Sequence, residues 1–233
     1  MLNQIIKKDG FEATIIRTAR RKTARVQVHA GVVSVIVPDS YPTNKIDSLV
    51  DKRTRWIKEK LLIQHQWLPL KQKEYVSGEC FCYLGRHYRL KVEINTEDES
   101  VKLVNGRLLV QTNSKQADDI RDALVSWYKD HAYKKLQAKV KRYSKLMNVT
   151  PASMKIRDYT ARWGSCSNKG HVQFNWKIII APNSAVDYVV VHELCHLIEH
   201  NHSDHFWKLV KSVMPDYEVQ RQWLRENGHL LVL

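Results

Sequence analysis

Two histidines and a glutamate lie close together near the end of the 233-residue chain, as the pattern His192-Glu193-x-x-His196. On a helix, residues four apart share one face about 6 Å apart, so both imidazoles can reach one ion. Zinc–nitrogen bonds of roughly 2.0–2.1 Å fit that spacing. Glu193 would accept a proton from a water held by the ion. The pattern therefore predicts a catalytic zinc site, because a buried helix carrying unpaired polar groups after the apolar run 188–191 is otherwise costly.

A catalytic zinc site needs a third protein ligand and an open position for water. Three histidines follow the motif, namely His200, His202 and His205. A continuing helix would carry His200 away from the ion. Asn201 can adopt the left-handed conformation that ends a helix, which would turn the chain and return His202. This geometry favours His202 over His205, with His200 as the weaker alternative.

The elements around the motif are expected to be helical. A helix is predicted over residues 185–200, capped by Asn183 or Ser184. Ser203 or Asp204 would cap a second helix. The apolar positions of that second helix repeat at helical spacing and would face the core: Phe206, Leu209, Val210 and Val213.

The rest of the chain predicts an α+β fold of two domains. Residues 1–113 form a mainly β domain with one helix over 43–67, and residues 114–233 form a domain that begins with a long helix over 117–146. Asn105-Gly106 predicts a hairpin turn, because both residues accept positive φ. No internal repeat is evident. The remaining predicted strands cover 13–17, 24–29, 32–37, 81–84, 88–94, 101–104, 108–111, 154–159, 162–166 and 171–180.

The chain resembles the YgjP-like metallopeptidases, relatives of the minigluzincins and of the Spartan-like DNA–protein crosslink proteases. The similarity extends from about Arg20 to about Trp223. It is carried by Arg162-Trp163-Gly164-Ser165-Cys166-Ser167, Phe174-Asn175-Trp176, the run 187–197 around the histidine motif, and Asn201-His202-Ser203 followed by Phe206-Trp207.

This resemblance implies a zincin-like second domain: helical, with a small antiparallel sheet and an active-site helix that carries the His-Glu-x-x-His motif. In the Spartan-like proteins a histidine followed three or four residues later by phenylalanine supplies the third zinc ligand, which matches His202 and Phe206. The family also implies a strand that pairs with extended substrate. The substrate-binding candidates are Arg162, Trp163, Gly164, Ser165 and Cys166. Judged from the residues alone, a packed hairpin carrying a buried Trp163 fits this segment equally well.

The expected activity is that of a zinc-dependent metallohydrolase, a metallopeptidase cleaving peptide bonds by Glu193-assisted attack of zinc-bound water. A donor for the oxyanion is not assigned, with His205, Tyr217 and Arg162 as candidates. Cys166 as a nucleophile is a weak alternative, because nothing in the sequence activates its thiol.

The chain is strongly basic, with a formal net charge of +14. An alternative function is therefore a nucleic-acid-associated protein, in which the zinc is structural or the site acts on DNA-bound proteins. DNA or RNA would bind the basic surface formed by Arg20, Arg21, Lys22 and Arg25, or by the long helix with Lys134, Lys135, Lys139, Lys141 and Arg142. In a further alternative, the first domain is an adaptor that recognises a protein partner.

No segment has the features of a signal peptide or approaches the roughly 20 apolar residues of a membrane span. We therefore expect a cytoplasmic protein with no membrane partner. Its four cysteines are expected to be reduced, and Cys80-Phe-Cys82 lacks the second pair that a zinc ribbon needs.

Overall fold

The structure, a computed structural model, describes residues 4–19, 23–29, 31–65, 72–94 and 99–233. The chain forms two compact units, Met1–Lys71 and Gln72–Leu233. Helices and small sheets are mixed throughout the described residues, as the predicted α+β class requires. No described helix combines the length and the apolar composition that crossing a bilayer would demand.

The first unit contains a four-stranded sheet in the order β1-β2-β4-β3, built from β1 (Ile5–Lys8), β2 (Phe11–Thr18), β3 (Arg25–His29) and β4 (Val32–Pro38). Strands β2 and β4 are parallel, and the two outer pairs are antiparallel. Alternate residues on β2 and β4 face the core, as a strand buried on one face requires. The core residues are Phe11, Ala13, Ile15, Val33, Val35 and Val37, together with Ile46, Val50 and Ile57 from the helices.

The predicted helix over 43–67 is wrong, because two helices form, α1 (Thr43–Asp51) and α2 (Thr54–His65). Its last two predicted residues, Gln66 and Trp67, lie outside the described residues. At the break, the Val50 carbonyl accepts hydrogen bonds from the amides of Lys52 and Arg53 and from the Thr54 hydroxyl. These local bonds replace the α-helical hydrogen bond that the Val50 carbonyl would otherwise accept from the Thr54 amide.

The second unit begins with a sheet in the order β5-β6-β8-β7, formed by β5 (Cys80–Tyr83), β6 (Arg86–Ile94), β7 (Ser100–Val104) and β8 (Arg107–Thr112). Its central pair is parallel and its outer pairs are antiparallel. The predicted Asn105-Gly106 hairpin is confirmed, with φ of 49° and 72° at the two turn residues.

Helix α3 (Ala117–Met147) confirms the long helix predicted over 117–146. Its buried face joins the second sheet in one hydrophobic core, where Leu90 and Leu108 pack in the same cluster as Ile120 and Leu124. The boundary predicted between residues 113 and 114 therefore falls inside the second unit, between β8 and α3.

A three-stranded sheet follows in the order β10-β11-β9, from β9 (Ser153–Arg157), β10 (Gly164–Cys166) and β11 (His171–Asn175). It is mixed rather than antiparallel as predicted, because β11 and β9 run parallel. The strand predicted over 171–180 ends at Asn175 and continues as the 3-10 helix η1 (Trp176–Ile180). The Asn175 side chain caps η1 by accepting from the Lys177 amide at 3.2 Å.

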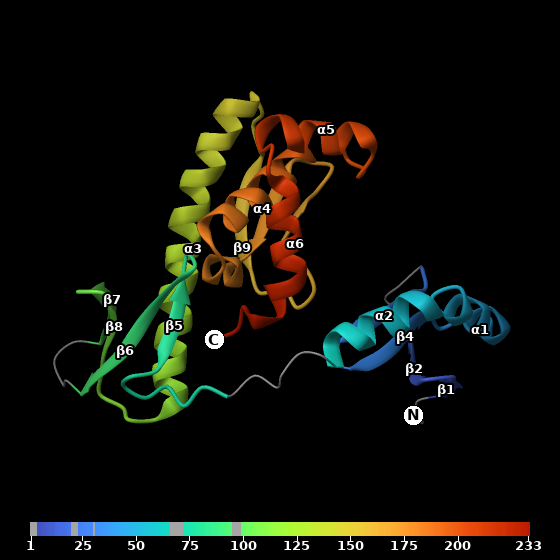
Figure 1. Cartoon of the computed structure of the whole chain (residues 1–233), viewed down its shortest axis with the longest axis horizontal. Helices are drawn as coiled ribbons and strands as arrows, with labels where there is room; N and C mark the ends of the chain where they lie inside the picture. Colours follow the sequence, from blue (N-terminus) through green and yellow to red (C-terminus); the bar gives the residue numbers. More distant parts are fainter. Residues whose placement is uncertain (1–3, 20–22, 30, 66–71, 95–98) are drawn as a thin grey trace. The chain divides into compact units, whose positions relative to one another are not determined.

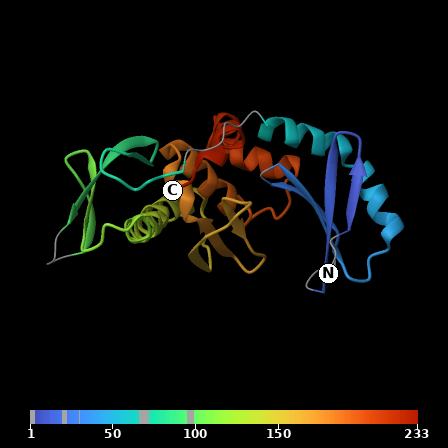
Figure 2. The ribbon, with the colours of Figure 1, turned by 90° about the horizontal axis from the view of Figure 1, so that it is seen from below.

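Helix α4 (Asn183–Cys195) is the buried centre of the second unit, with α3 on one side and α5 (Asp204–Val213) and α6 (Tyr217–Asn227) on the other (Figures 1 and 2). The 3-10 helix η2 (Gly228–Leu230) follows α6. The helix predicted over 185–200 thus begins earlier and stops at Cys195, with His196 as its C-cap. Asn201 has no positive φ, so the predicted left-handed helix end is wrong.

Candidate metal centre and active site

Helix α4 is fixed in the core before it reaches the histidine motif. Pro182 is its N-cap, and the residues Val189, Val190 and Val191 are buried. Asp187 accepts hydrogen bonds from Lys139 Nζ on α3 at 2.6 Å and from Asn183 Nδ2 at 3.2 Å. Because the Lys139–Asp187 ion pair is largely shielded from water, removing one of these two residues would leave the other as a buried, unpaired charge. These contacts therefore fix the position of α4, including the last turn, which carries the histidine motif.

Three of the predicted site residues converge just beyond that turn. His192, His196 and His202 each offer a nitrogen, and these atoms lie within 4.8 Å of one another, so the group could hold a metal ion. A tetrahedral ion with zinc–nitrogen bonds of 2.0–2.1 Å would separate its nitrogen ligands by about 3.3 Å. His200 and His205, the alternatives for the third position, do not belong to the group that the described residues form.

The orientation of the imidazoles suits a metal. His196 Nδ1 donates to the Glu199 carbonyl at 3.0 Å, which leaves Nε2 with its lone pair. The Nε2 atoms of His192 and His202 lie 3.0 Å apart, so their lone pairs would repel unless a proton or a cation lay between them. His192 Nδ1 is buried and has no hydrogen-bond partner among the described residues. The donor set therefore fits a cation bound by three neutral imidazoles.

The side chain of Phe206 packs against all three imidazoles. It is fully buried, and its ring centroid lies 5.0 Å from that of His192, 4.5 Å from that of His196 and 4.8 Å from that of His202. Ser203, one of the two predicted caps, is the N-cap of α5 and accepts from the Phe206 amide. This cap sets the direction of α5 and so brings His202 back towards α4.

Burial shifts the pKa values of the charged groups at this site. Burial lowers the pKa of His192 to about 3, and the nearby His196, His202 and Arg221 add to the shift. Burial also raises the pKa of Glu193 to about 8, against the opposing charge of Arg162. The His192 imidazole is therefore held in the neutral form that binds metals. A divalent cation beside Glu193 would in turn favour its ionised form.

Glu193 lies directly against the edge strand β10. A Cβ atom on Gly164 would stand 2.6 Å from Glu193 Cγ and Oε1, closer than real contacts allow. A larger residue at position 164 would therefore displace the Glu193 side chain from its place against the strand. Strand β10 pairs with β11 on one side only among the described strands, so its other edge is available to an extended chain.

Asn175 holds the loop that leads into β10. Its side-chain Nδ2 donates to the carbonyls of Tyr159 at 2.9 Å and Arg162 at 3.3 Å, while its backbone amide donates to the Trp163 carbonyl. The Tyr159 hydroxyl lies 3.2 Å from Ser165 Oγ. Asn175 is part of the motif that carries the family resemblance, and these bonds give it a positioning role that the sequence did not reveal.

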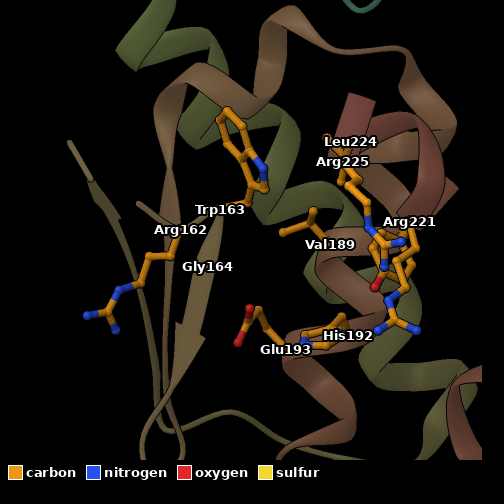
Figure 3. Close-up of a pocket in the computed structure, with 10 residues that line it drawn as sticks. Arg162, Trp163, Gly164, Val189, His192, Glu193, Arg221, Leu224 and Arg225 are labelled. Carbon is orange, nitrogen blue, oxygen red and sulfur yellow. The ribbon is translucent and has the colours of Figure 1, made fainter. Parts of the chain in front are cut away.

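A pocket of about 370 Å³ opens beside Glu193 (Figure 3). Three of the predicted substrate-binding residues line it, namely Arg162, Trp163 and Gly164. Besides Val189, four other lining residues were not predicted from the sequence: Tyr188, Arg221, Leu224 and Arg225. The four-residue spacing of Tyr188 to His192 and of Arg221 to Arg225 was the available signal, since it places each pair on one helical face.

The other predicted residues lie outside this pocket lining. Ser165 and Cys166 belong to β10. Burial and the charge of Glu193 raise the pKa of Cys166 to about 11, which disfavours a nucleophilic thiolate. Neither of the other oxyanion candidates lines the pocket: the Tyr217 hydroxyl donates to Glu218, and His205 is exposed on α5.

A histidine cluster beside a buried carboxyl group and an edge strand is the arrangement expected of a metallopeptidase. The family model described as the YgjP-like metallopeptidase domain matches residues 22–227. The chain therefore belongs to the YgjP-like metallopeptidase family, as the sequence motifs predicted. Membership in a peptidase family implies polypeptide substrates, whereas nucleic-acid binding stays a prediction.

Among solved structures, the chain is similar to the crystal structure of the metallopeptidase zymogen of Pyrococcus abyssi abylysin. The two share 20% identity and a TM-score of 0.37, over 41% of this chain and 94% of that one. No curated protein sequence matches the chain as a relative.

Proposed function

We propose that the chain is a zinc-dependent metallopeptidase, with His192, His196 and His202 as metal ligands and Glu193 as general base. The observation that carries the proposal is the convergence of three imidazole nitrogens within 4.8 Å beside a buried glutamate. Three imidazoles without a thiolate or a carboxylate suit zinc among the divalent ions that proteins use. Three protein ligands also leave a position open for solvent or substrate.

When bound, zinc supplies a Lewis acid that polarises the scissile carbonyl and lowers the pKa of water. Glu193 accepts the proton of the attacking water and passes it to the leaving amine. The low exposure of Glu193, 6%, keeps bulk water from competing for that proton. Arg162, whose charge acts on Glu193, favours the carboxylate form that can accept it.

The substrate is proposed to bind as an extended strand along the free edge of β10. Backbone hydrogen bonds to Gly164–Cys166 would align the peptide, since unpaired amides and carbonyls at a sheet edge accept another strand. Gly164 touches Glu193, so a peptide paired there passes the proposed base. In this proposal Ser165 and Cys166 act through their backbone groups.

The proposed base is tested by Glu193→Gln, which keeps the shape of the side chain and removes its basicity. We expect the variant to bind one zinc per chain and to lose peptide hydrolysis by about 10²-fold or more. The measurements are zinc content by atomic spectroscopy and cleavage of a casein or mixed-peptide substrate. Glu199→Gln is the matched control, because that carboxylate accepts from the Asn201 amide and does not line the pocket. Unchanged hydrolysis by Glu193→Gln would exclude the base.

The proposed third ligand is tested by comparing alanine substitutions at His202, His205 and His200. Only His202→Ala is expected to weaken zinc binding strongly, because the other two side chains lie outside the cluster. Competition with a chromogenic chelator measures the affinity of each purified variant. A protein that loses zinc through His205→Ala but keeps it through His202→Ala would contradict the assignment.

A further inference from the structure

The pocket beside Glu193 carries an excess of positive charge. Arg162, Arg221 and Arg225 line it, and Glu193 is the single acidic residue in its lining. Apolar and aromatic side chains form the remaining wall: Trp163, Val189, Leu224 and Tyr188. A pocket of this composition favours an anionic group with an apolar neighbourhood.

Two of these arginines come from one helix. Arg221 and Arg225 stand one turn apart on α6 and extend towards the part of the pocket near His192 (Figure 3). Arg162 lies beyond Glu193, and its guanidinium points away from the other two (Figure 3). Like charges one helical turn apart repel each other, and an anion bound between the two guanidinium groups would relieve that repulsion.

The protein does not supply that partner within its described part. The acidic residues of α6 are engaged elsewhere, because Glu218 accepts from Tyr217 and Glu226 accepts from Gln222. Neither Arg221 nor Arg225 forms an ion pair with any residue that the structure describes.

Arg221 is also held in place. Its guanidinium lies 4.4 Å from the centroid of the Trp207 ring. Trp207 in turn stacks on His202 at 5.6 Å and on Tyr217 at 5.4 Å. A guanidinium supported by an aromatic ring loses less freedom on binding a ligand. The stack also links Arg221, through Trp207, to His202, a proposed zinc ligand.

We propose that Arg221 and Arg225 form a subsite that binds a carboxylate of the polypeptide substrate. This inference rests on the proposed peptidase function and names the substrate class: peptides with an acidic group near the scissile bond. Guanidinium groups bind carboxylates through paired, charge-assisted hydrogen bonds. Because the same pocket is lined by His192 and Glu193, the carboxylate lies within a residue or two of the bond that is cut.

The carboxylate can come from an Asp or Glu side chain or from the C-terminus of the substrate. Fluorogenic peptides distinguish the sources, with Asp, Glu, Asn, Gln or Ala at each position around the cleaved bond and with a free or amidated C-terminus. We expect kcat/KM to fall by about tenfold when the bound carboxylate is replaced by an amide. The sensitive position identifies the source.

Substitution of the arginines tests their role. In Arg221→Gln/Arg225→Gln the preference for acidic over amide peptides should disappear, and Arg221→Lys/Arg225→Lys should restore part of it. Lys208→Gln/Lys211→Gln is the matched control, because it removes the same charge from exposed positions on α5. Equal cleavage of acidic and amide peptides by the wild type, or an unchanged preference in the double glutamine variant, would overturn the subsite.

A binding measurement separates this proposal from the proposed function. Labelled acidic and amide peptides are titrated with the zinc-loaded Glu193→Gln protein, followed by fluorescence anisotropy. Tighter binding of the acidic peptide that is lost in Glu193→Gln/Arg221→Gln/Arg225→Gln supports the subsite even if the wild type cleaves nothing. Equal binding of both peptides overturns the subsite, whereas cleavage by the wild type decides the peptidase function separately.

Discussion

Gly164 and Glu193 form a contact that no other residue type at position 164 can make. A Cβ atom there would meet three atoms of the Glu193 side chain within 2.8 Å. Glu193 is flanked by the histidine cluster and by β10, so the carboxyl group has to move when a methyl group is added. The position of the proposed base is therefore determined by a glycine on another element.

Gly164→Ala is expected to reduce peptide hydrolysis while zinc stays bound. Displacement of a general base by about 1 Å costs on the order of 10²-fold in rate. Steady-state cleavage, zinc content and thermal melting of the purified variant measure the three properties separately. A variant that folds, binds zinc and cleaves at the wild-type rate would show that the contact does not position Glu193.

The sequence predicted the residues of the histidine cluster through their local spacing along the chain. His192, Glu193 and His196 follow from helical geometry, and Ser203 from its preference for helix N-termini. His202 joins the cluster as predicted, but not through a left-handed Asn201. The arginines of α6 were missed because their four-residue spacing shows only that they share a helical face, whereas their approach to α4 depends on packing between helices.

At the scale of elements, a hairpin turn supports the start of α4. Leu84 and Gly85 form the turn between β5 and β6, with φ of 49° and 76°. Their amides donate to the carbonyls of Ile179 and Ile180 in η1, at 2.8 and 3.3 Å. A Cβ atom on Gly85 would lie 2.8 Å from the Cα atom of Pro182, the N-cap of α4.

Gly85→Ala and Gly106→Ala form a matched pair that measures this support. Both glycines have φ of about 70–80° in equivalent hairpin turns, but a Cβ on Gly106 meets nothing within 4 Å. Gly106→Ala should therefore cost only the conformational term of about 1–2 kcal/mol. Gly85→Ala should cost more by about 1–3 kcal/mol, because the turn must separate from Pro182. Urea unfolding of both variants gives the difference in their free energies of unfolding. Equal losses would mean that the contact between the turn and Pro182 contributes nothing to stability.

Two of the elements predicted wrongly, the helix over 43–67 and the strand over 171–180, share one physical cause. The Thr54 hydroxyl donates to the Val50 carbonyl, and the Asn175 side chain accepts from the Lys177 amide. These hydrogen bonds interrupt a backbone pattern that the apolar residues alone would continue. In η1, Ile178, Ile179 and Ile180 are all buried, so the segment has no alternation of buried and exposed residues from which its secondary structure could be predicted. The hairpin at Asn105-Gly106 and helix α3 were predicted well because their turn chemistry and length are unambiguous.

At the scale of the whole molecule, the two four-stranded sheets share one topology. Each has two hairpins joined by a parallel central pair, and helix follows strand in both units. Gly31 and Gly106 mark corresponding turns, and Ile46 and Ile120 are buried on the helices that follow. No internal repeat is evident in the sequence, because the two units share a strand order and not a pattern of residues.

The two units have separate hydrophobic cores. One buried cluster lies wholly within residues 11–57 and the other within residues 75–231. A boundary after β8 was expected because the sequence changes there from strands to a long helix. The side chains of β5, β6 and β8 nevertheless pack in the same cluster as α3. Burial, rather than the type of element, therefore determines where the unit begins.

The fragment Gln72–Leu233 is expected to fold alone, because it retains its complete core and all the residues proposed for the site. It should bind one zinc, melt within about 4 °C of the corresponding transition in the full chain, and cleave short peptides at a similar rate.

A fragment of residues 114–233 is the matched control. It lacks Phe81, Leu90, Leu108 and Val110, so the buried face of α3 would be exposed and the fragment should fail to melt cooperatively. Calorimetry of both fragments decides the point, and a cooperative transition in the shorter one would show that the sheet β5–β8 is not needed to hold the site.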